Sequence, residues 1–307
     1  MRPADWTKNV FILPAILFTA SSLIASNQLD ELYTKIMPTV WAIVAFSLLS
    51  SGFYAINDSL DYLSDRTHPV KCRRPIASGA ISPLGGRIFG FVLTAIGIII
   101  GFCINPDVGY ALLTYFALQT CYNLGLKRIV VVDAVALAIG FSIRAAVGAF
   151  AIEVPVSMWL LGLVFFATLY LAFIKRKCDL ESARAVDSSW SPSAGYGDPL
   201  ELNWLLGLSG VTIILSWILY ALSPHAQQLF GVKASGFAML TPFVIIVVHR
   251  FYHRAQHGRS DSPLSSFIDD KVMAAGMLLF ASGLGMFLFI PSVSDWLSRL
   301  IFAGVPS

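Results

Sequence analysis

The sequence predicts an all-α integral membrane protein, a polytopic bundle of about nine transmembrane helices. Composition is the first observation: of the 307 residues, 56% are hydrophobic and 13% are charged, and the mean hydropathy is +0.73. In soluble domains about a quarter of the residues are charged. Apolar runs also recur along the whole length with only short polar segments between them. We therefore expect a single integral membrane domain over residues 1–307.

Each predicted helix corresponds to an apolar run close to the length that a membrane requires. A hydrocarbon core of roughly 30 Å needs about 20 helical residues. Prolines and glycines inside the runs are compatible with helices, because neighbouring spans repack around them. The first run follows basic residues as a signal peptide does, but further runs follow it, so we expect it to be retained. The predicted spans are 10–26, 38–56, 87–104, 108–126, 129–152, 158–174, 202–222, 232–249 and 272–290.

The distribution of Lys and Arg predicts the orientation. With a cytoplasmic N-terminus, 17 of the 21 Lys and Arg residues fall on the cytoplasmic side, while Arg144 lies inside the fifth span. The positive-inside rule therefore predicts a protein of the inner (cytoplasmic) membrane with its N-terminus in the cytoplasm and its C-terminus outside. Acidic residues are also more numerous on the cytoplasmic side, so we expect the active site among the loops 57–86, 175–201 and 250–271.

Cysteine and charge patterns limit the partners. The four cysteines show no close pairing, which indicates neither a disulfide framework nor a zinc site. The net charge is only +3, and the basic residues lie between apolar runs. They are therefore expected to meet phosphate groups or the headgroups of membrane lipids, with no nucleic acid as a partner. Nothing in the sequence sets an oligomeric state.

The clearest candidate site follows the second span. Asn57, Asp58, Asp61 and Asp65 fall on one face of a helix at about 100° per residue. Carboxylates that share a face repel one another unless a cation lies between them, and Mg²⁺ commonly bridges carboxylates to substrate phosphates. We therefore predict that these four residues form a magnesium site that holds a diphosphate, with Asp58 and Asp61 as catalytic residues. A solvated, acidic helix end is the alternative interpretation.

A basic segment follows directly. It contains Arg66, Lys71, Arg73 and Arg74. Arg can bind phosphate oxygens through two parallel hydrogen bonds, and Lys acts as a point charge. We expect this segment to close over a metal-bound diphosphate and to stabilise it as a leaving group. In the alternative interpretation, these residues only fix the topology or contact anionic lipid.

Together these residues resemble a known family. The pattern Asn-Asp-x-x-Asp-x-x-x-Asp at 57–65 is similar to the motif of the UbiA superfamily of intramembrane prenyltransferases. Further segments resemble one branch of it, the decaprenyl-phosphate phosphoribosyltransferases, and the likeness covers nearly the whole chain. These segments are Arg2-Pro3-x-x-Trp6-x-Lys8-Asn9, Asp65-Arg66-x-His68-Pro69-x-Lys71-x-x-Arg74-Pro75-Ile76-Ala77, Tyr122-x-x-Gly125-Leu126-Lys127, Ile143-Arg144-Ala145 with Gly148, Pro155-x-Ser157-x-Trp159, and Lys175-Arg176.

The resemblance implies both an architecture and a reaction. The architecture is a helical bundle around a central cavity that is open to the cytoplasm and to lipid. In the reaction, 5-phosphoribosyl 1-diphosphate donates phosphoribose to a polyprenyl phosphate, and diphosphate is released in the presence of Mg²⁺. The resemblance also suggests a role in the synthesis of cell-wall precursors.

This chemistry requires several separated cations. Lys8, Lys127, Lys175 and Arg176 all map to the cytoplasmic ends of predicted spans, and we expect them to bind substrate. Each is also compatible with a topology anchor whose charged end reaches the membrane surface. A prenyl donor with an uncharged acceptor would need fewer such contacts.

Arg144 is the basic residue that the membrane makes most costly. It lies near mid-membrane, roughly 16 Å along a helix from Asp133 and almost in register with it. A lipid-facing arginine there is unfavourable, so we predict a catalytic and substrate-binding contact with phosphate, with an ion pair to Asp133 as the alternative. Tyr122, one turn before Lys127, is expected to donate a hydrogen bond to ribose or phosphate. Without the family pattern it would be interpreted as packing.

Two other functions compete with this one. A prenyl-diphosphate-dependent aromatic prenyltransferase would use the same acidic motif, but typical members carry a second Asp-x-x-x-Asp motif after the sixth span. Residues 175–183 lack that spacing, and Asp179 stands where the phosphoribosyl branch usually has Glu. A transporter with Asp133 and Arg144 on an ion path is the second alternative. It gives no reason for the acidic cluster, the basic segment and the N-terminal motif to occur together.

Overall fold

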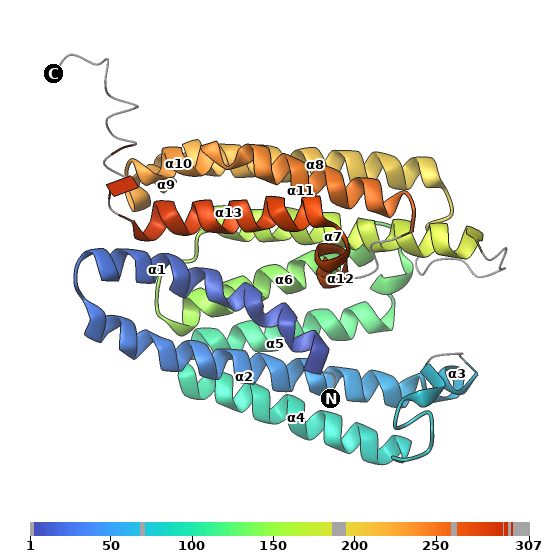
Figure 1. Cartoon of the computed structure of the whole chain (residues 1–307). Coiled ribbons are helices and arrows are strands. Elements are labelled where there is room, and N and C mark those ends of the chain that lie inside the picture. Colours follow the sequence, from blue (N-terminus) through green and yellow to red (C-terminus); the bar gives the residue numbers. More distant parts are fainter. Residues whose placement is uncertain are drawn as a thin grey trace. The chain divides into compact units, whose positions relative to one another are not determined.

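The protein is helical throughout the part that the structure describes. The computed structural model describes residues 3–67, 71–185, 195–258 and 263–290, with short pieces at 292–293 and 296. Its elements there are helices, which confirms the predicted all-α class (Figure 1). The chain divides into two compact units. Unit 1 comprises residues 1–121 and 142–156, and unit 2 comprises residues 122–141 and 157–307.

The helices alternate with short connections along both units. The first half of the chain forms η1 Pro3–Ile12, α1 Leu13–Ala25, α2 Leu29–Leu60, α3 Tyr62–Arg66, η2 Lys71–Arg73, α4 Pro83–Ile104, α5 Pro106–Leu124, η3 Leu126–Arg128 and α6 Val132–Ala151. The second half forms α7 Met158–Ala185, α8 Pro199–Leu222, α9 Pro224–Phe230, α10 Lys233–Met239, α11 Thr241–Ala255, α12 Pro263–Asp269 and α13 Lys271–Phe289.

Eight helices of the described residues are long and apolar enough to cross a membrane. They correspond to eight of the predicted spans, and the protein is a multi-pass membrane protein. The remaining predicted span, 108–126, does form a helix, α5, which is 19 residues long. Polar side chains such as Gln119 and Asn123 make α5 less apolar than the other eight, which is why it falls outside that group.

Two helices are longer than their apolar cores. α2 has 32 residues and continues to Leu60, and α7 has 28 residues and continues to Ala185. The prediction of a loop from residue 175 was therefore wrong for residues 175–185. The charged end of α7 stays helical because long polar side chains are good helix formers and pair one turn apart. Lys177 and Glu181 form such a pair at 2.8 Å.

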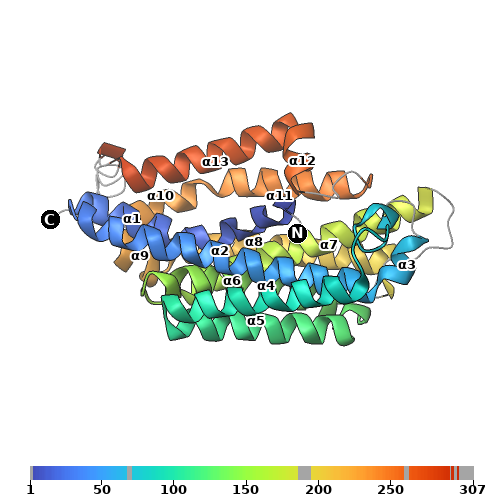
Figure 2. The same cartoon turned by 90° about the horizontal axis from the view of Figure 1, so that it is seen from below.

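Glycines allow α2 and α4 to approach at backbone distance in unit 1. The two helices run side by side in both views (Figures 1 and 2). A Cβ added to Gly52 of α2 would lie 2.5 Å from the carbonyl oxygen of Gly90, and one added to Gly97 of α4 would lie 2.6 Å from the carbonyl oxygen of Ala45. Small residues replace apolar side chains at this contact because helix association in lipid depends on close packing rather than on the hydrophobic effect.

The rest of unit 1 packs around the middle of α2. Phe46 and Leu49 of α2 are fully buried against Leu112 of α5, and the ring of Tyr115 lies 4.6 Å from that of Phe46. Asn105 reverses the chain between α4 and α5. Its side-chain oxygen accepts a hydrogen bond from the backbone of α5, and its amide donates to a carbonyl of α6 at 2.7 Å. The amide of one residue thus ties three helices together.

Unit 2 has its own buried core. It is built from α7, α8, α11 and α13, with buried side chains such as Phe173, Leu206, Phe251 and Met273. A polar group inside it finds a backbone acceptor: the hydroxyl of Tyr170 donates to the carbonyl of Val248 at 2.8 Å. Such pairing is required because an unsatisfied polar group in an apolar interior is costly.

Candidate active site

An arginine joins two of the predicted metal ligands in unit 1. Nη1 of Arg74 lies 2.6 Å from Oδ2 of Asp65 and 3.0 Å from Oδ1 of Asp58. Asp65 is buried, with 3% of its surface exposed, and Asp58 is half-buried. The structure thus brings two of the predicted metal ligands together with one arginine of the basic segment.

The helix on which the acids lie is not continuous. α2 ends at Leu60, and α3 begins at Tyr62, with Asp61 between them. The backbone N–H of Asp61 still donates to the carbonyl of Asn57 at 2.9 Å, so the chain bends without unwinding. The expectation of one unbroken helix over 57–65 was wrong. Asp61 is exposed at this bend, whereas Asn57 is half-buried.

The acidic residues suit the ion that the motif predicts. Within the described ranges, no three His, Cys, Asp or Glu side chains are grouped closely enough to hold a metal ion. Asp58 and Asp65 nevertheless converge on one cationic atom of Arg74, which means that two carboxylates already point at a common position. Carboxylate and amide oxygens are the ligands that Mg²⁺ prefers. The donor set therefore fits Mg²⁺, provided that the Arg74 side chain moves away.

Backbone hydrogen bonds order the basic segment. The N–H of Arg74 donates to the carbonyl of Lys71 at 3.0 Å, and the N–H of Ser78 donates to the carbonyl of Arg74 at 2.8 Å. Arg66 reaches across from α3, where its Nε donates to the carbonyl of Ala77 at 3.1 Å. Arg66 therefore holds the segment in place, a structural contact that the sequence did not predict. Lys71 and Arg73 are exposed.

Arg144 is buried in an aromatic environment of unit 1. Its Nη2 donates to the hydroxyl of Tyr115 at 2.9 Å, and its Nε donates to Oδ1 of Asn9 at 3.3 Å. The guanidinium lies 4.6 Å from the centre of the Phe46 ring, which is a cation–π contact. The side-chain amide of Asn9 donates in turn to Ser47 at 2.8 Å. Arg144 points into protein, as predicted from the cost of placing it in lipid.

The N-terminal motif also attaches to α2. Nε1 of Trp6 donates to the hydroxyl of Ser51 at 3.1 Å, and Nζ of Lys8 lies 3.4 Å from the hydroxyl of Tyr54. Both partners lie on α2 in the turns that precede the acidic residues. Lys8 of η1 thus contacts the same helix that carries Asp58.

A second polar cluster lies in unit 2. Asp133 is completely buried, and its two carboxylate oxygens accept from Nε of Arg176 at 2.9 Å and from the hydroxyl of Tyr196 at 2.6 Å. The Tyr196 hydroxyl accepts from the backbone N–H of Val131 at 2.8 Å. Burial and then the bond to Asp133 raise the pKa of Tyr196, so it remains a neutral donor. Asp179 pairs with Arg176 at 3.5 Å.

Of the remaining predicted residues of unit 2, Tyr122 interacts with this cluster through Arg176. Lys127 is half-buried, and Lys175 is exposed on α7 next to Arg176. The ion pair between Arg144 and Asp133, considered as an alternative, is replaced by the pair between Arg176 and Asp133.

Several residues of these clusters were not singled out from the sequence. Asn9 was quoted only as part of a motif, and Tyr115 is one aromatic residue among many. Tyr196 follows Asp133 by 63 residues, so no local spacing connects the two. Burying a charge without a partner is costly, so Asp133 and Arg144, which lie inside predicted spans, require polar partners. This requirement could have directed attention to Asn9, Tyr115 and Tyr196.

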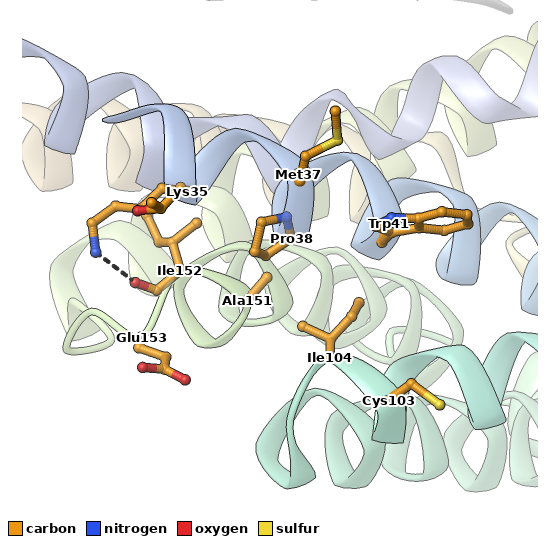
Figure 3. A pocket seen from close by; sticks show the side chains of 10 residues that line it. Lys35, Met37, Pro38, Trp41, Cys103, Ile104, Ala151, Ile152 and Glu153 are labelled. Carbon is orange, nitrogen blue, oxygen red and sulfur yellow. Dashed lines mark hydrogen bonds between the residues drawn. The ribbon is translucent and has the colours of Figure 1, made fainter. Parts of the chain in front are cut away.

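A groove at the opposite end of α2 contains none of the predicted site residues (Figure 3). It has a volume of about 440 Å³ and is lined by Pro38, Trp41, Ile104 and Glu153 among others. Lys35 closes one end, where its Nζ donates to the carbonyl of Ile152 at 3.1 Å. Because α2 rises about 1.5 Å per residue, the α2 residues that line the groove lie roughly 25–36 Å from Asp58 along the helix.

The described chain combines membrane-spanning helices with an acidic cluster at the end of α2. The UbiA prenyltransferase family matches residues 10–273, and the chain belongs to this family. The family resemblance that the sequence motifs indicated is thereby confirmed.

Curated relatives match nearly the whole chain. A protein of Mycolicibacterium smegmatis named decaprenyl-phosphate phosphoribosyltransferase is 29% identical over 93% of this chain and 89% of its own length. A protein of Corynebacterium glutamicum with the same name is 28% identical over 94% of this chain and 86% of its own length. Among solved structures, a UbiA homologue from Archaeoglobus fulgidus bound to GPP and Mg²⁺ is similar in fold, with a TM-score of 0.59 at 17% identity. That match covers 81% of this chain and 88% of the homologue.

Proposed function

We propose that this protein transfers the 5-phosphoribosyl group of 5-phosphoribosyl 1-diphosphate to a polyprenyl phosphate and releases diphosphate. The observation that carries the proposal is the similarity, over more than nine-tenths of the chain, to proteins named for this activity. The Asp58, Asp65 and Arg74 cluster supports it, because a diphosphate requires both a carboxylate-held cation and an arginine.

The donor diphosphate is assigned to the end of α2. Asn57, Asp58, Asp61 and Asp65 would hold Mg²⁺, which when bound supplies positive charge to the departing diphosphate. Arg74 then exchanges its carboxylate partners for phosphate oxygens, with Lys71 and Arg73 on the same segment as further cations. These residues stabilise charge that develops on the leaving group.

The acceptor needs no side-chain base. A polyprenyl phosphate is already anionic near neutral pH, so its oxygen can attack the anomeric carbon directly. The bond between that carbon and the diphosphate oxygen breaks as the new bond forms, with oxocarbenium character at the ribose. Catalysis therefore rests on positioning and electrostatics. Lys8, Tyr122, Lys127, Arg144, Lys175 and Arg176 are assigned to the remaining phosphate and ribose contacts.

One observation weighs against an aromatic prenyltransferase. That activity is associated with a second acidic motif after the sixth predicted span, which here is the charged end of α7. In the described part of α7, Asp179 pairs with Arg176, and Glu181 pairs with Lys177. The acids of this segment are thus matched by cations of the same segment, which suits phosphate-rich substrates better than a second magnesium site.

The site is assigned to the cytoplasmic face of the inner membrane. The Lys and Arg distribution of the sequence supports an N-terminus in the cytoplasm and a C-terminus outside. The soluble donor, 5-phosphoribosyl 1-diphosphate, would then reach the site from the cytoplasm, while the polyprenyl phosphate remains in the membrane.

A comparison of two donors in separate reactions tests the proposal. Purified protein in detergent with Mg²⁺ and a polyprenyl phosphate is supplied with radiolabelled 5-phosphoribosyl 1-diphosphate or, separately, with a prenyl diphosphate and an aromatic acceptor. The expected result is a labelled, charged lipid and one equivalent of diphosphate from the first mixture alone. Product from the second mixture alone would replace the proposal by the aromatic prenyltransferase.

A further inference from the structure

Three histidines lie along one exposed side of α11 and the turn that follows it. His249, His253 and His257 are spaced four residues apart, and all three are exposed. Residues four apart on a helix are neighbours on its surface. None of the three belongs to the candidate active site, and all lie in unit 2.

The imidazole rings are in contact with one another. The ring centres of His253 and His257 are 5.0 Å apart at an interplanar angle of 56°, and those of His249 and His253 are 6.3 Å apart at 16°. His253 is therefore the shared member of two neighbouring pairs. An aromatic contact between exposed imidazoles is weak by itself. Ring packing therefore does not explain why all three of these positions are histidine.

One hydrogen bond fixes which nitrogen of His257 is available. Its Nδ1 lies 2.9 Å from the backbone carbonyl oxygen of His253. A carbonyl can only accept, so Nδ1 carries the proton and Nε2 of the neutral ring keeps its lone pair. Metal-ligating histidines commonly use this arrangement, in which one ring nitrogen donates to a carbonyl and the other binds the ion.

We propose that His253 and His257 form a two-imidazole site for a transition-metal dication such as Zn²⁺, with His249 as an alternative partner of His253. Two histidines four residues apart on a helix are the protein half of several zinc sites, and His257 keeps this spacing in the turn that directly follows α11. A site of two protein ligands leaves the other coordination positions to water. Such a site is compatible with the finding that no three His, Cys, Asp or Glu side chains of the described residues are grouped closely enough to hold a metal ion.

The site differs in chemistry from the acidic motif. Imidazole suits Zn²⁺, Ni²⁺ and Cu²⁺, whereas carboxylates and amides suit Mg²⁺. The two sites should therefore not compete for the same ion. A metal bound by His253 and His257 would link the last turn of α11 to the turn at 256–258. Arg250 and Arg254 lie on the same segment, and pair with Asp270 and Asp269 at 2.6 and 3.4 Å.

Zinc titration of the full-length protein tests this inference without any substrate. The metal-free protein in detergent is titrated with Zn²⁺ by calorimetry, and separately with Co²⁺ while the visible absorption is followed. His253→Ala, which disrupts both pairs, is expected to weaken Zn²⁺ binding by about tenfold or more. His249→Ala should leave the binding constant nearly unchanged, and His257→Ala should weaken it while leaving residual binding.

His225→Ala is the matched control. His225 is the other histidine among the described residues, and its ring lies 3.3 Å from the hydroxyl of Ser157, away from α11. Its loss should leave Zn²⁺ binding intact. Equal binding by the wild type and His253→Ala, or loss of binding in His225→Ala alone, would overturn the proposal. Because the titration requires neither donor nor acceptor, its outcome does not depend on the proposed transferase activity.

Discussion

Arg74 lies 2.6 Å from Asp65 and holds that buried carboxylate on the same atom that contacts Asp58 at 3.0 Å. An arginine thus occupies the position on which two predicted magnesium ligands converge. Arg74 offsets part of the negative charge of these two carboxylates, and under the proposed function it would become available to phosphate once a divalent cation held them.

Replacement of Arg74 should separate metal binding from turnover. Arg74→Ala removes the cation that competes for Asp58 and Asp65, so Mn²⁺ binding without donor, measured by electron paramagnetic resonance, should become tighter. The rate of transfer should fall by about a hundredfold or more, because the diphosphate loses an arginine contact. Arg87→Ala, an exposed arginine of α4 in the same unit, should change neither quantity. Weaker Mn²⁺ binding in Arg74→Ala would contradict the competition.

The acids should be required for turnover but not for folding. Asp58→Asn and Asp61→Asn should each lower the rate of transfer by about a hundredfold or more, since each removes charge from a catalytic metal site. Thermal unfolding should change little for Asp61→Asn, because that side chain is exposed. Initial rates with labelled donor, measured beside the unfolding midpoint, check this. A near-normal rate in either variant would remove that residue from the site.

The Asp133 cluster should contribute more to stability than any surface pair. Asp133→Asn weakens the pairing of Arg176 inside the protein and should lower the free energy of unfolding by about 3–5 kcal/mol. Tyr196→Phe removes one hydrogen bond to a buried charge and should cost about 1.5–3 kcal/mol. Reversible unfolding in mixed detergent micelles measures both. Tyr170→Phe, whose hydroxyl serves a neutral carbonyl, should cost less than Tyr196→Phe.

Arg144 should not tolerate lysine. A lysine retains the charge but lacks the planar guanidinium that contacts Tyr115, Asn9 and the Phe46 ring together. Arg144→Lys should therefore lower transfer by about tenfold or more while the chain stays folded, as judged by its unfolding midpoint. Tyr115→Phe, which removes one of these contacts, should have a smaller effect in the same direction. A fully active Arg144→Lys variant would assign Arg144 a purely electrostatic role.

Acid should destabilise unit 2 through Asp270. Although burial opposes its charged form, hydrogen bonds from Arg250 and from the backbone N–H of Met273 lower the pKa of Asp270. A carboxyl whose pKa is lowered in the folded state contributes stability above its ordinary value of about 3.9, and this contribution is lost as the pH falls through the lower, folded value. The unfolding midpoint of wild type should drop over that interval, and Asp270→Asn should show a shallower drop.

The sequence predicted the membrane spans and the acidic residues at the end of α2, but not the side chains with which these acidic residues form ion pairs. Apolar runs predicted the spans because lipid requires long, uninterrupted helices, and the acidic pattern at 57–65 predicted that Asp58 and Asp65 share a cation. It did not show that Arg74 lies between these two carboxylates, since the segment that carries Arg74 has no periodicity. Nor could it connect Tyr196 with Asp133, because contacts between distant segments depend on packing that no local pattern encodes.

The glycine contact of α2 with α4 has a consequence for how the site can open. Arg74 lies in the chain between α2 and α4, and these two helices approach each other at backbone distance at Gly52 and Gly97. Sliding or separation of those helices would expose backbone atoms that now touch. Under the proposed function, we therefore expect rotation of the long Arg74 side chain, rather than movement of the two helices, to free Asp58 and Asp65 for a metal ion.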